Sequence, residues 1–167
     1  MGKLILKCGN ILDYLDGVDA IVNSTNKYMI CGSGVCGAIY RGANKDKLED
    51  YCRSNFKGLM IINEVRITKG FDLNMDIMHI YCPKYYDSKN PIDELKQSYI
   101  NIFKVAKENK YSKIISVSLG TGIHGYKHNY IAKDIIQLII QLVDKLNIGF
   151  ILVLSDEETI QLYNGFL

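Results

Sequence analysis

Short apolar runs alternate with amphipathic stretches along almost all of this 167-residue chain. Each run has the length of a buried strand, and the stretches between them repeat apolar residues at helical spacing. The runs lie at residues 4–6, 20–23, 64–68, 76–81, 113–117 and 150–154. Because strands that alternate with helices form a sheet covered by helices, we predict one α/β domain over residues 1–167 with a mostly parallel sheet.

Several of the expected helices carry local start signals. Apolar spacing predicts helices over residues 34–43 and 130–146. Asn90 followed by Pro91 is typical of a helix cap and first helical position. Residues 155–158 match a capping box, with Ser first and Glu three residues later, and so predict a last short helix.

Composition excludes several classes of function. The formal net charge is +2 and no block of Lys and Arg forms a stripe, so a nucleic-acid partner is not expected. No uninterrupted apolar run approaches the ~20 residues of a membrane span. We therefore expect a soluble, monomeric protein without a membrane partner.

The cysteines indicate a reducing environment. The chain has five, an odd number, and none of them pairs as Cys-x-x-Cys. This usage favours free thiols and a cytoplasmic location over a disulfide framework. Cys31 and Cys36 have no His close to them in sequence, so we predict neither a metal site nor a cofactor.

Two asparagines and a glycine-rich turn follow the second apolar run. Asn23 and Asn26 come at the end of the run, and residues 32–34 read Gly-Ser-Gly before an amphipathic stretch. An amide side chain has donors and acceptors that suit the hydroxyls of a sugar. Closely spaced glycines expose backbone N–H groups at a helix start, which suits phosphate. The segment therefore predicts a nucleotide-like ligand, although each Asn taken alone is more typical of a turn.

A second glycine loop at residues 120–125 follows the run at 113–117. In an open parallel sheet, ligands bind beyond the carboxyl ends of the strands. Residues 8–11 and 155–156 leave the first and last strands at the same edge. We therefore expect these loops to surround one cleft.

At these residues the chain resembles the macrodomain family, which binds ADP-ribose and in many members hydrolyses ADP-ribosyl bonds. The resemblance covers nearly the whole chain. It is carried by Gly9-Asn10-Ile11, by residues 19–26 and 32–39, by residues 67–73 and 77–83, and by residues 118–126. It implies a three-layer α/β/α sandwich around a mixed, mostly parallel sheet of about six strands.

The resemblance also implies the site. Asn26 would hold the ribose distal from adenine, Asn23 would support the loop behind it, and Asn10 would accept from the adenine amino group. The candidate catalytic residues are Asn23, Asn26, Gly34 and His124. The candidate ADP-ribose contacts are Asn10, Ile11, Ala20, Asn23, Asn26, Gly32, Ser33, Gly34, Val35, Cys36, Ser118, Gly120, Thr121, Gly122, Ile123, His124 and Ser155.

The chain departs from the family pattern where catalysis is concerned. Cys36 stands where one hydrolase branch has Asp, so a carboxylate general base is missing there. Some viral macrodomains with activity look similar, and their proposed mechanism uses a water polarised by the phosphate of the ligand. We expect the Cys36 thiol to pack near the ribose, because no His or cation is evident to activate it.

The three histidines and Gly122 each have a predicted environment or role. His124 replaces a family Phe or Tyr, and its ring is able to stack, donate to phosphate or take a proton. His79 lies within an apolar run and is expected to be a core residue with hydrogen-bond partners. We expect His128 to be exposed, and Gly122 to adopt a positive φ.

Three functions remain open at this point. The first is an enzyme that hydrolyses mono-ADP-ribosyl esters on protein Asp and Glu, with O-acetyl-ADP-ribose as a further substrate. The second is a module that reads ADP-ribose without turnover. The third, a dinucleotide- or RNA-binding domain outside the family, is disfavoured because residues 23–31 separate the Gly-x-Gly-x-x-Gly match from its strand. The otherwise complete loops favour the enzyme.

Overall fold

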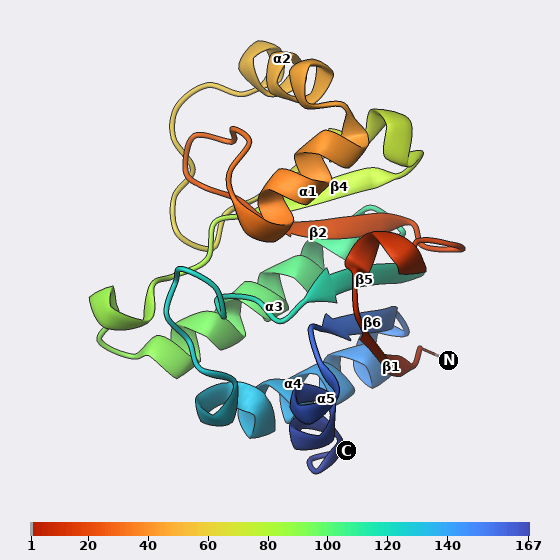
Figure 1. The fold of residues 1–167 in the computed structure, drawn as a ribbon, viewed down its shortest axis with the longest axis vertical. Coiled ribbons are helices and arrows are strands. Elements are labelled where there is room, and N and C mark those ends of the chain that lie inside the picture. The colour runs from red at the N-terminus through yellow and green to blue at the C-terminus, as the bar shows by residue number, and fades with distance from the viewer. Residues whose placement is uncertain (1) are drawn as a thin grey trace.

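The computed structural model describes residues 2–167, which form one six-stranded sheet in the order β1-β6-β5-β2-β4-β3 (Figure 1). The strands are β1 Leu4–Cys8, β2 Ala20–Ser24, β3 Val65–Lys69, β4 Asp76–Ile80, β5 Lys113–Val117 and β6 Gly149–Leu154. β3 runs antiparallel to β4, and the other neighbouring pairs are parallel. The expected mixed, mostly parallel sheet is confirmed.

Helices cover both faces of this sheet. They are α1 Gly34–Ala43, α2 Lys45–Asn55, α3 Pro91–Glu108, α4 His128–Leu146 and α5 Glu157–Asn164, with short 3-10 turns η1 Ile11–Tyr14, η2 Phe71–Leu73 and η3 Tyr85–Asp87. Sequence spacing did not predict α2, because only Leu48 and Cys52 of its residues are buried. The last helix is capped by Asp156, whose side chain accepts from the Thr159 N–H at 2.8 Å, so the capping box expected from Ser155 is wrong.

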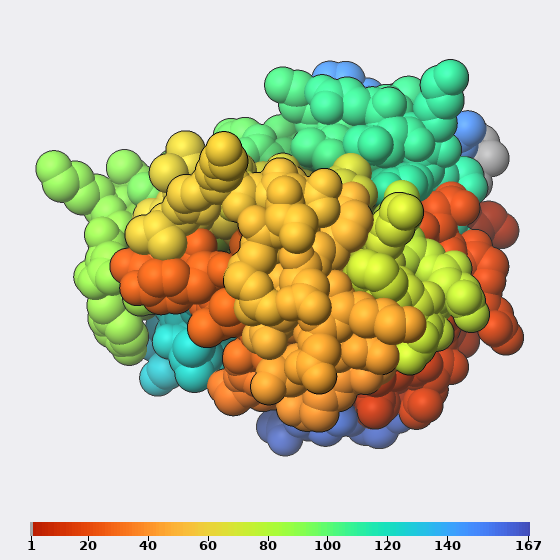
Figure 2. Space-filling view, turned by 90° about the horizontal axis from the view of Figure 1, so that it is seen from above, coloured from red at the N-terminus to blue at the C-terminus, as the bar shows by residue number. Residues whose placement is uncertain are grey.

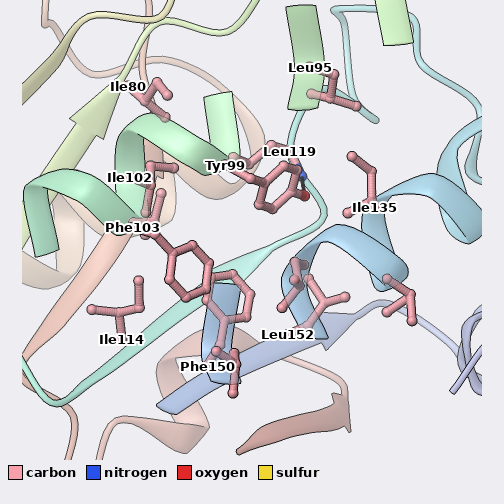
Figure 3. Packing of buried hydrophobic residues seen from close by; sticks show 14 of the residues in the cluster. Ile80, Leu95, Tyr99, Ile102, Phe103, Ile114, Leu119, Ile135, Phe150 and Leu152 are labelled. Carbon is pink, nitrogen blue, oxygen red and sulfur yellow. Dashed lines mark hydrogen bonds between the residues drawn. The ribbon is translucent and has the colours of Figure 1, made fainter. Parts of the chain in front are cut away.

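Alternate residues of each buried strand enter two separate cores. One core joins α3, α4 and α5 to one face of the sheet, and the other joins α1 and α2 to the opposite face (Figure 1). In the first core Phe103 stacks on Phe150 with ring centroids 5.2 Å apart, and the Tyr99 hydroxyl accepts from the Leu119 N–H (Figure 3). In the space-filling view from above, α1 and α2 cover the middle of the second face (Figure 2). The three-layer α/β/α sandwich is thereby confirmed.

The two central strands separate soon after they pair. β2 and β5 share two register positions, Ala20 with Ile114 and Ile21 with Ile115, whereas β2 with β4 and β5 with β6 share five each. The chain leaves β5 through α4 on one face and leaves β2 through α1 on the other. Such a change of direction in an open sheet creates a crevice at the carboxyl ends of the two strands.

A buried polar chain links the strands beside this crevice. The Asn23 amide nitrogen lies 3.1 Å from Nδ1 of His79, and the Thr68 hydroxyl lies 2.9 Å from its Nε2. All three side chains are buried. Since an amide nitrogen only donates, His79 accepts at Nδ1, carries its proton at Nε2 and is neutral. The prediction of a core histidine with hydrogen-bond partners is confirmed.

The neutral His79 makes folding depend on pH. Burial lowers the pKa of His79 to about 3, against about 6.5 in an unfolded chain. Between these values the unfolded state binds more protons, so the stabilisation is present above pH 6.5 and is lost as the pH falls. Below about pH 6, urea unfolding should show that the free energy of unfolding falls more steeply for the wild type than for His79→Gln, by about 1.4 kcal/mol per pH unit. Parallel slopes for the two proteins would contradict a buried, neutral His79.

Candidate functional site

A cleft of about 630 Å³ opens at the carboxyl edge of the sheet. This volume lies within the range of ordinary small-ligand sites. The cleft is lined by Gly9, Asn10, Ile11, Ser24, Thr25, Asn26, Gly32, Ser33, Gly34, Val35, Cys36, Ala38, Val117, Ser118, Gly120, Thr121, Gly122, Ile123, His124, His128, Val153, Leu154 and Ser155. The structure therefore brings the two glycine loops and the ends of β1 and β6 together, as expected.

The first glycine loop passes directly into α1. Gly34, the first helical residue, has φ +59°, a conformation that favours glycine. Ser33 precedes it in extended conformation and makes no side-chain cap. The first N–H groups of a helix have no acceptor within the helix, so those of Gly34, Val35 and Cys36 are available to a ligand in the cleft.

The second glycine loop is a compact turn closed by its own backbone. The Tyr126 N–H donates to the Gly120 carbonyl at 3.0 Å. Gly120 has φ +79°, and a Cβ there would lie 2.7 Å from the Tyr126 ring, so both conformation and space require glycine. In the part of the chain that the structure describes, the N–H groups of Thr121, Gly122 and Ile123 donate to no protein acceptor. Successive free N–H groups of this kind form an anion-binding nest.

The backbone conformation of Gly122 differs from the prediction. The positive φ values of this loop belong to Gly120 and Gly125, because these residues make its two sharp turns, so the prediction of a positive φ at Gly122 is wrong. A Cβ at Gly122 would have no atom within 4 Å. The residue therefore matters through the open space above it, which is the cleft.

Asn26 lines the cleft and also shapes its own loop. Its side-chain oxygen accepts from the N–H groups of Tyr28 at 3.0 Å and Ile30 at 3.3 Å, and its amide nitrogen donates to the Ile30 carbonyl at 2.7 Å. An Asn amide has two acceptor sites and two hydrogens. One amide hydrogen is left to donate to a ligand hydroxyl, so the turn role and the ligand role coexist.

Two expected contacts are not in the cleft wall. Ala20 is fully buried at the first position of β2, four residues before the carboxyl end at which the cleft opens. Asn23 is also fully buried, because its side chain points to the interior, where its amide nitrogen reaches His79 and lies 3.6 Å from Sγ of Cys36. Cys36 does line the cleft, so Asn23 contacts the site from behind.

Asn10 is exposed at the end of β1 and caps η1. Its side-chain oxygen accepts from the Leu12 N–H at 3.0 Å. One acceptor position and the amide nitrogen remain for a ligand. Ile11 beside it is only 2% exposed and forms an apolar wall.

The walls of the cleft contain no charged side chain among the described residues. A bound anion would therefore be held by backbone N–H groups rather than by Lys or Arg. Cys36, His124 and His128 are the lining side chains that carry a thiol or an imidazole. Burial raises the pKa of the Cys36 thiol, which agrees with a packing role rather than a nucleophilic one.

The orientation of His124 is fixed by a backbone carbonyl. Its Nδ1 lies 3.1 Å from the carbonyl oxygen of Pro83, and its ring stands edge-on to Tyr81 at 6.1 Å. A carbonyl only accepts, so Nδ1 carries the hydrogen and Nε2 of the neutral ring is an acceptor. His124 is thus able to accept a proton or a hydrogen bond from a bound ligand or water.

His128 was expected to be exposed, and this is wrong. It is the first residue of α4, it is half-buried and it lines the cleft. Its Nδ1 lies 2.9 Å from the Tyr163 hydroxyl, which lies 2.8 Å from the Ser118 hydroxyl. The burial arises from the tertiary fold, because Tyr163 of α5 contacts the His128 ring at the start of α4. The sequence signal that could have placed His128 in the cleft is its position three residues after the second glycine loop.

Other kinds of site can be checked directly. Among residues 2–167, no three His, Cys, Asp or Glu side chains are grouped so that they could hold a metal ion. In the same range, no helix combines the length and apolarity that crossing a membrane requires.

Comparison with known sequences finds the same family as the motifs. A family model for the Macro domain matches residues 22–135. An uncharacterized protein of Fusobacterium nucleatum is 33% identical over 150 residues, which cover 87% of this chain and 84% of that protein. An O-acetyl-ADP-ribose deacetylase of Escherichia fergusonii is 30% identical over 156 residues, 90% of this chain and 88% of the relative.

Comparison with solved structures identifies the same family as the sequence comparison. The Oceanobacillus iheyensis macrodomain in its structure with ADP has a TM-score of 0.86 and 27% identity, with 99% of this chain and 90% of that chain covered. A mutant of the same protein with ADPR has a TM-score of 0.84 and 27% identity, with 99% and 91% covered. With the sheet order, the two glycine loops and these matches in agreement, the chain belongs to the macrodomain family.

Proposed function

We propose that this protein binds ADP-ribose in the cleft and hydrolyses ester-linked ADP-ribosyl groups. The proposed substrates are O-acetyl-ADP-ribose and mono-ADP-ribosyl esters of protein Asp and Glu side chains. Support comes from the relatives that are named O-acetyl-ADP-ribose deacetylase and from the similar macrodomain structures with ADP and ADPR. Hydrolysis consumes one water and yields ADP-ribose and a carboxylic acid.

The observation that carries the proposal is the pair of glycine loops facing one cleft. Residues 34–36 and 121–123 offer free backbone N–H groups from opposite sides of the gap between β2 and β5. A diphosphate is the part of ADP-ribose that such donors would hold, because each phosphate oxygen accepts hydrogen bonds without needing a cation.

The remaining parts of the ligand then follow from the cleft walls. The adenine would lie toward Asn10 and Ile11, which follow β1, and the distal ribose toward Asn26, which follows β2. The remaining hydrogen of the Asn26 amide would donate to a ribose hydroxyl.

Catalysis in this cleft would not use a carboxylate of the protein, because none lines it in the described residues. We propose that the attacking water is held beside the ester by the diphosphate and the first glycine loop, so that positioning supplies most of the rate. His124 borders the second loop and has Nε2 available, so it would contact the phosphate or distal ribose and is the candidate side chain for accepting a proton.

A non-catalytic reader of ADP-ribose is the alternative. The observation that favours it is Cys36, which stands where one hydrolase branch of the family has Asp. The two functions share the binding step and differ in turnover.

Replacing Gly122 should block binding without unfolding the protein. Its φ is not positive and a Cβ meets open space, so Gly122→Val would fill the cleft beside the second loop rather than strain the backbone. By calorimetry, Gly122→Val should bind ADP-ribose about tenfold more weakly or worse than the wild type, a loss of about 1.4 kcal/mol. The matched control Gly122→Ala adds one methyl and should lose less, with an unchanged melting temperature. If Gly122→Val keeps wild-type affinity, the phosphates do not lie over this loop.

Turnover should depend on Asn26 and tolerate loss of the Cys36 thiol. With O-acetyl-ADP-ribose as substrate and acetate release as readout, Asn26→Ala should lose nearly all turnover, because its amide both shapes the loop and meets the ribose. Cys36→Ala should retain much of the rate, since the thiol is proposed only to pack. Loss of turnover in Cys36→Ala with intact binding would give the thiol a chemical role. A wild type that binds ADP-ribose yet releases neither acetate nor carboxyl-linked ADP-ribose would be a reader.

A further inference from the structure

Exposed apolar side chains gather in three segments beside the cleft. We call these segments, residues 27–30, 57–62 and 84–89, the apolar rim. They hold six of the eleven large apolar side chains that are exposed in the described chain, namely Tyr28, Ile30, Leu59, Ile61, Ile62 and Tyr86. A single exposed apolar residue is ordinary, whereas a group of them marks an interaction surface.

The three segments lie next to one another at the carboxyl edge of the sheet. The Met60 N–H donates to the Lys27 carbonyl at 2.9 Å, which joins the first two segments. The Asn63 N–H, directly after the second segment, donates to the Tyr81 carbonyl at the end of β4 at 2.8 Å. In the space-filling view the segments come together on the left, coloured orange, yellow and light green (Figure 2). The apolar rim is therefore one continuous surface.

The apolar rim borders the end of the cleft at which we place the distal ribose. Its first segment directly follows Asn26. In its third segment the Tyr85 N–H donates to the His124 carbonyl at 2.8 Å. Both Asn26 and His124 line the cleft. Since the ester of the proposed substrates is attached to the distal ribose, the group that carries the ester would leave the cleft across the apolar rim.

Buried groups hold the first two segments in place. Met29 and Met60 each lie between exposed apolar neighbours and pack into the core on the α1 face of the sheet. The Arg66 guanidinium donates to the carbonyls of Gly58 at 3.3 Å and Leu59 at 3.4 Å. Because these segments are already ordered, a partner that binds them pays little for ordering.

The charge of the apolar rim is mostly positive. Its exposed charged residues are Lys27, Lys57, Lys84, Lys89 and Asp87. Within residues 2–167 none of these lysines forms an ion pair. Two acids beside the rim are already engaged, because Glu49 accepts from the Cys31 N–H and Glu64 pairs with Arg66. Exposed apolar groups interspersed with lysines complement a segment that has apolar and acidic side chains.

We propose that the apolar rim binds the polypeptide that carries the ADP-ribosyl ester, and that the favoured ester lies in an acidic segment with apolar residues. The inference rests on the proposed function and chooses between its two substrates. The acetyl group of O-acetyl-ADP-ribose has two carbons and is too small to cover the rim. A polypeptide that continues from a modified Asp or Glu would cross it.

The binding test uses a peptide in which an uncleavable amide replaces the ester between ADP-ribose and a Glu side chain. One version has acidic and apolar residues on both sides of this Glu, and the other has Lys in place of the flanking acids. In calorimetric titrations the wild type should bind the acidic version at least about fivefold more tightly than free ADP-ribose. The Lys version should show no such gain, and added salt should reduce the gain of the acidic version.

Substitutions in the apolar rim should remove this gain and leave free ADP-ribose affinity unchanged. The variants are Ile61→Ser and Lys57→Glu, whose side chains are exposed and do not line the cleft. The matched controls Ile140→Ser and Lys133→Glu lie exposed on α4 and should keep the full gain. In turnover assays the rim variants should lower kcat/KM for the ester-linked peptide and leave acetate release from O-acetyl-ADP-ribose unchanged.

Several results would overturn the inference. One is a wild type that binds ADP-ribose and the acidic peptide equally well, and another is a pair of rim variants that keep the full gain. If the rim substitutions instead abolish binding to vesicles of anionic lipid, or dissociate a dimer seen by sedimentation, with peptide affinity unchanged, the rim has another occupant and the inference is wrong. A wild type that binds no ADP-ribose would contradict the proposed function itself, which separates the two failures.

Discussion

The pairing of β2 with β5 ends after two residues, and the cleft exists because of this. Beyond Ile21 and Ile115, β2 continues along β4 while β5 continues along β6. The backbone groups at the ends of the two strands then face a gap instead of each other. Because α1 and α4 leave on opposite faces, their loops border that gap from both sides, and every residue assigned to the ligand depends on this geometry.

The gap is lined with backbone donors and neutral side chains. Free N–H groups of residues 34–36 and 121–123 face a cleft whose described walls contain no charged side chain. An anion bound there would be held by fixed backbone dipoles that need no reorganisation. Because the described wall contains no carboxylate, the phosphate and the positioned water have the central part in the proposed hydrolysis, with His124 as the candidate proton acceptor.

Two buried hydrogen-bond chains hold side chains in or behind the cleft wall. Thr68 and His79 hold the amide of Asn23, which in turn contacts Cys36 in the wall. In the same way Ser118 and Tyr163 hold His128. Each chain fixes a ring or amide through side chains that are themselves buried.

The two glycine loops and the resemblance to the macrodomain family together predicted most of the candidate site from the sequence. Composition identifies the two glycine loops, apolar runs identify the strands, and the resemblance supplies the individual contacts. All of the expected contacts except Ala20 and Asn23 line the cleft. Those two lie outside the cleft wall because β2 buries the residues that precede its carboxyl end. His128 was missed because its burial is created by α5, which lies far along the chain. Helix α2 was missed because it buries a narrow stripe of two residues.

The central claim is that one ligand bridges the two loops across the gap between β2 and β5. Amide chemical-shift mapping by NMR during titration with ADP-ribose tests it most directly, because each loop N–H is observed separately. We expect the largest shifts to fall together on Gly34, Val35, Gly122 and Ile123, with a further shift at Ile11. Shifts confined to one loop, or centred away from the carboxyl edge of the sheet, would contradict it.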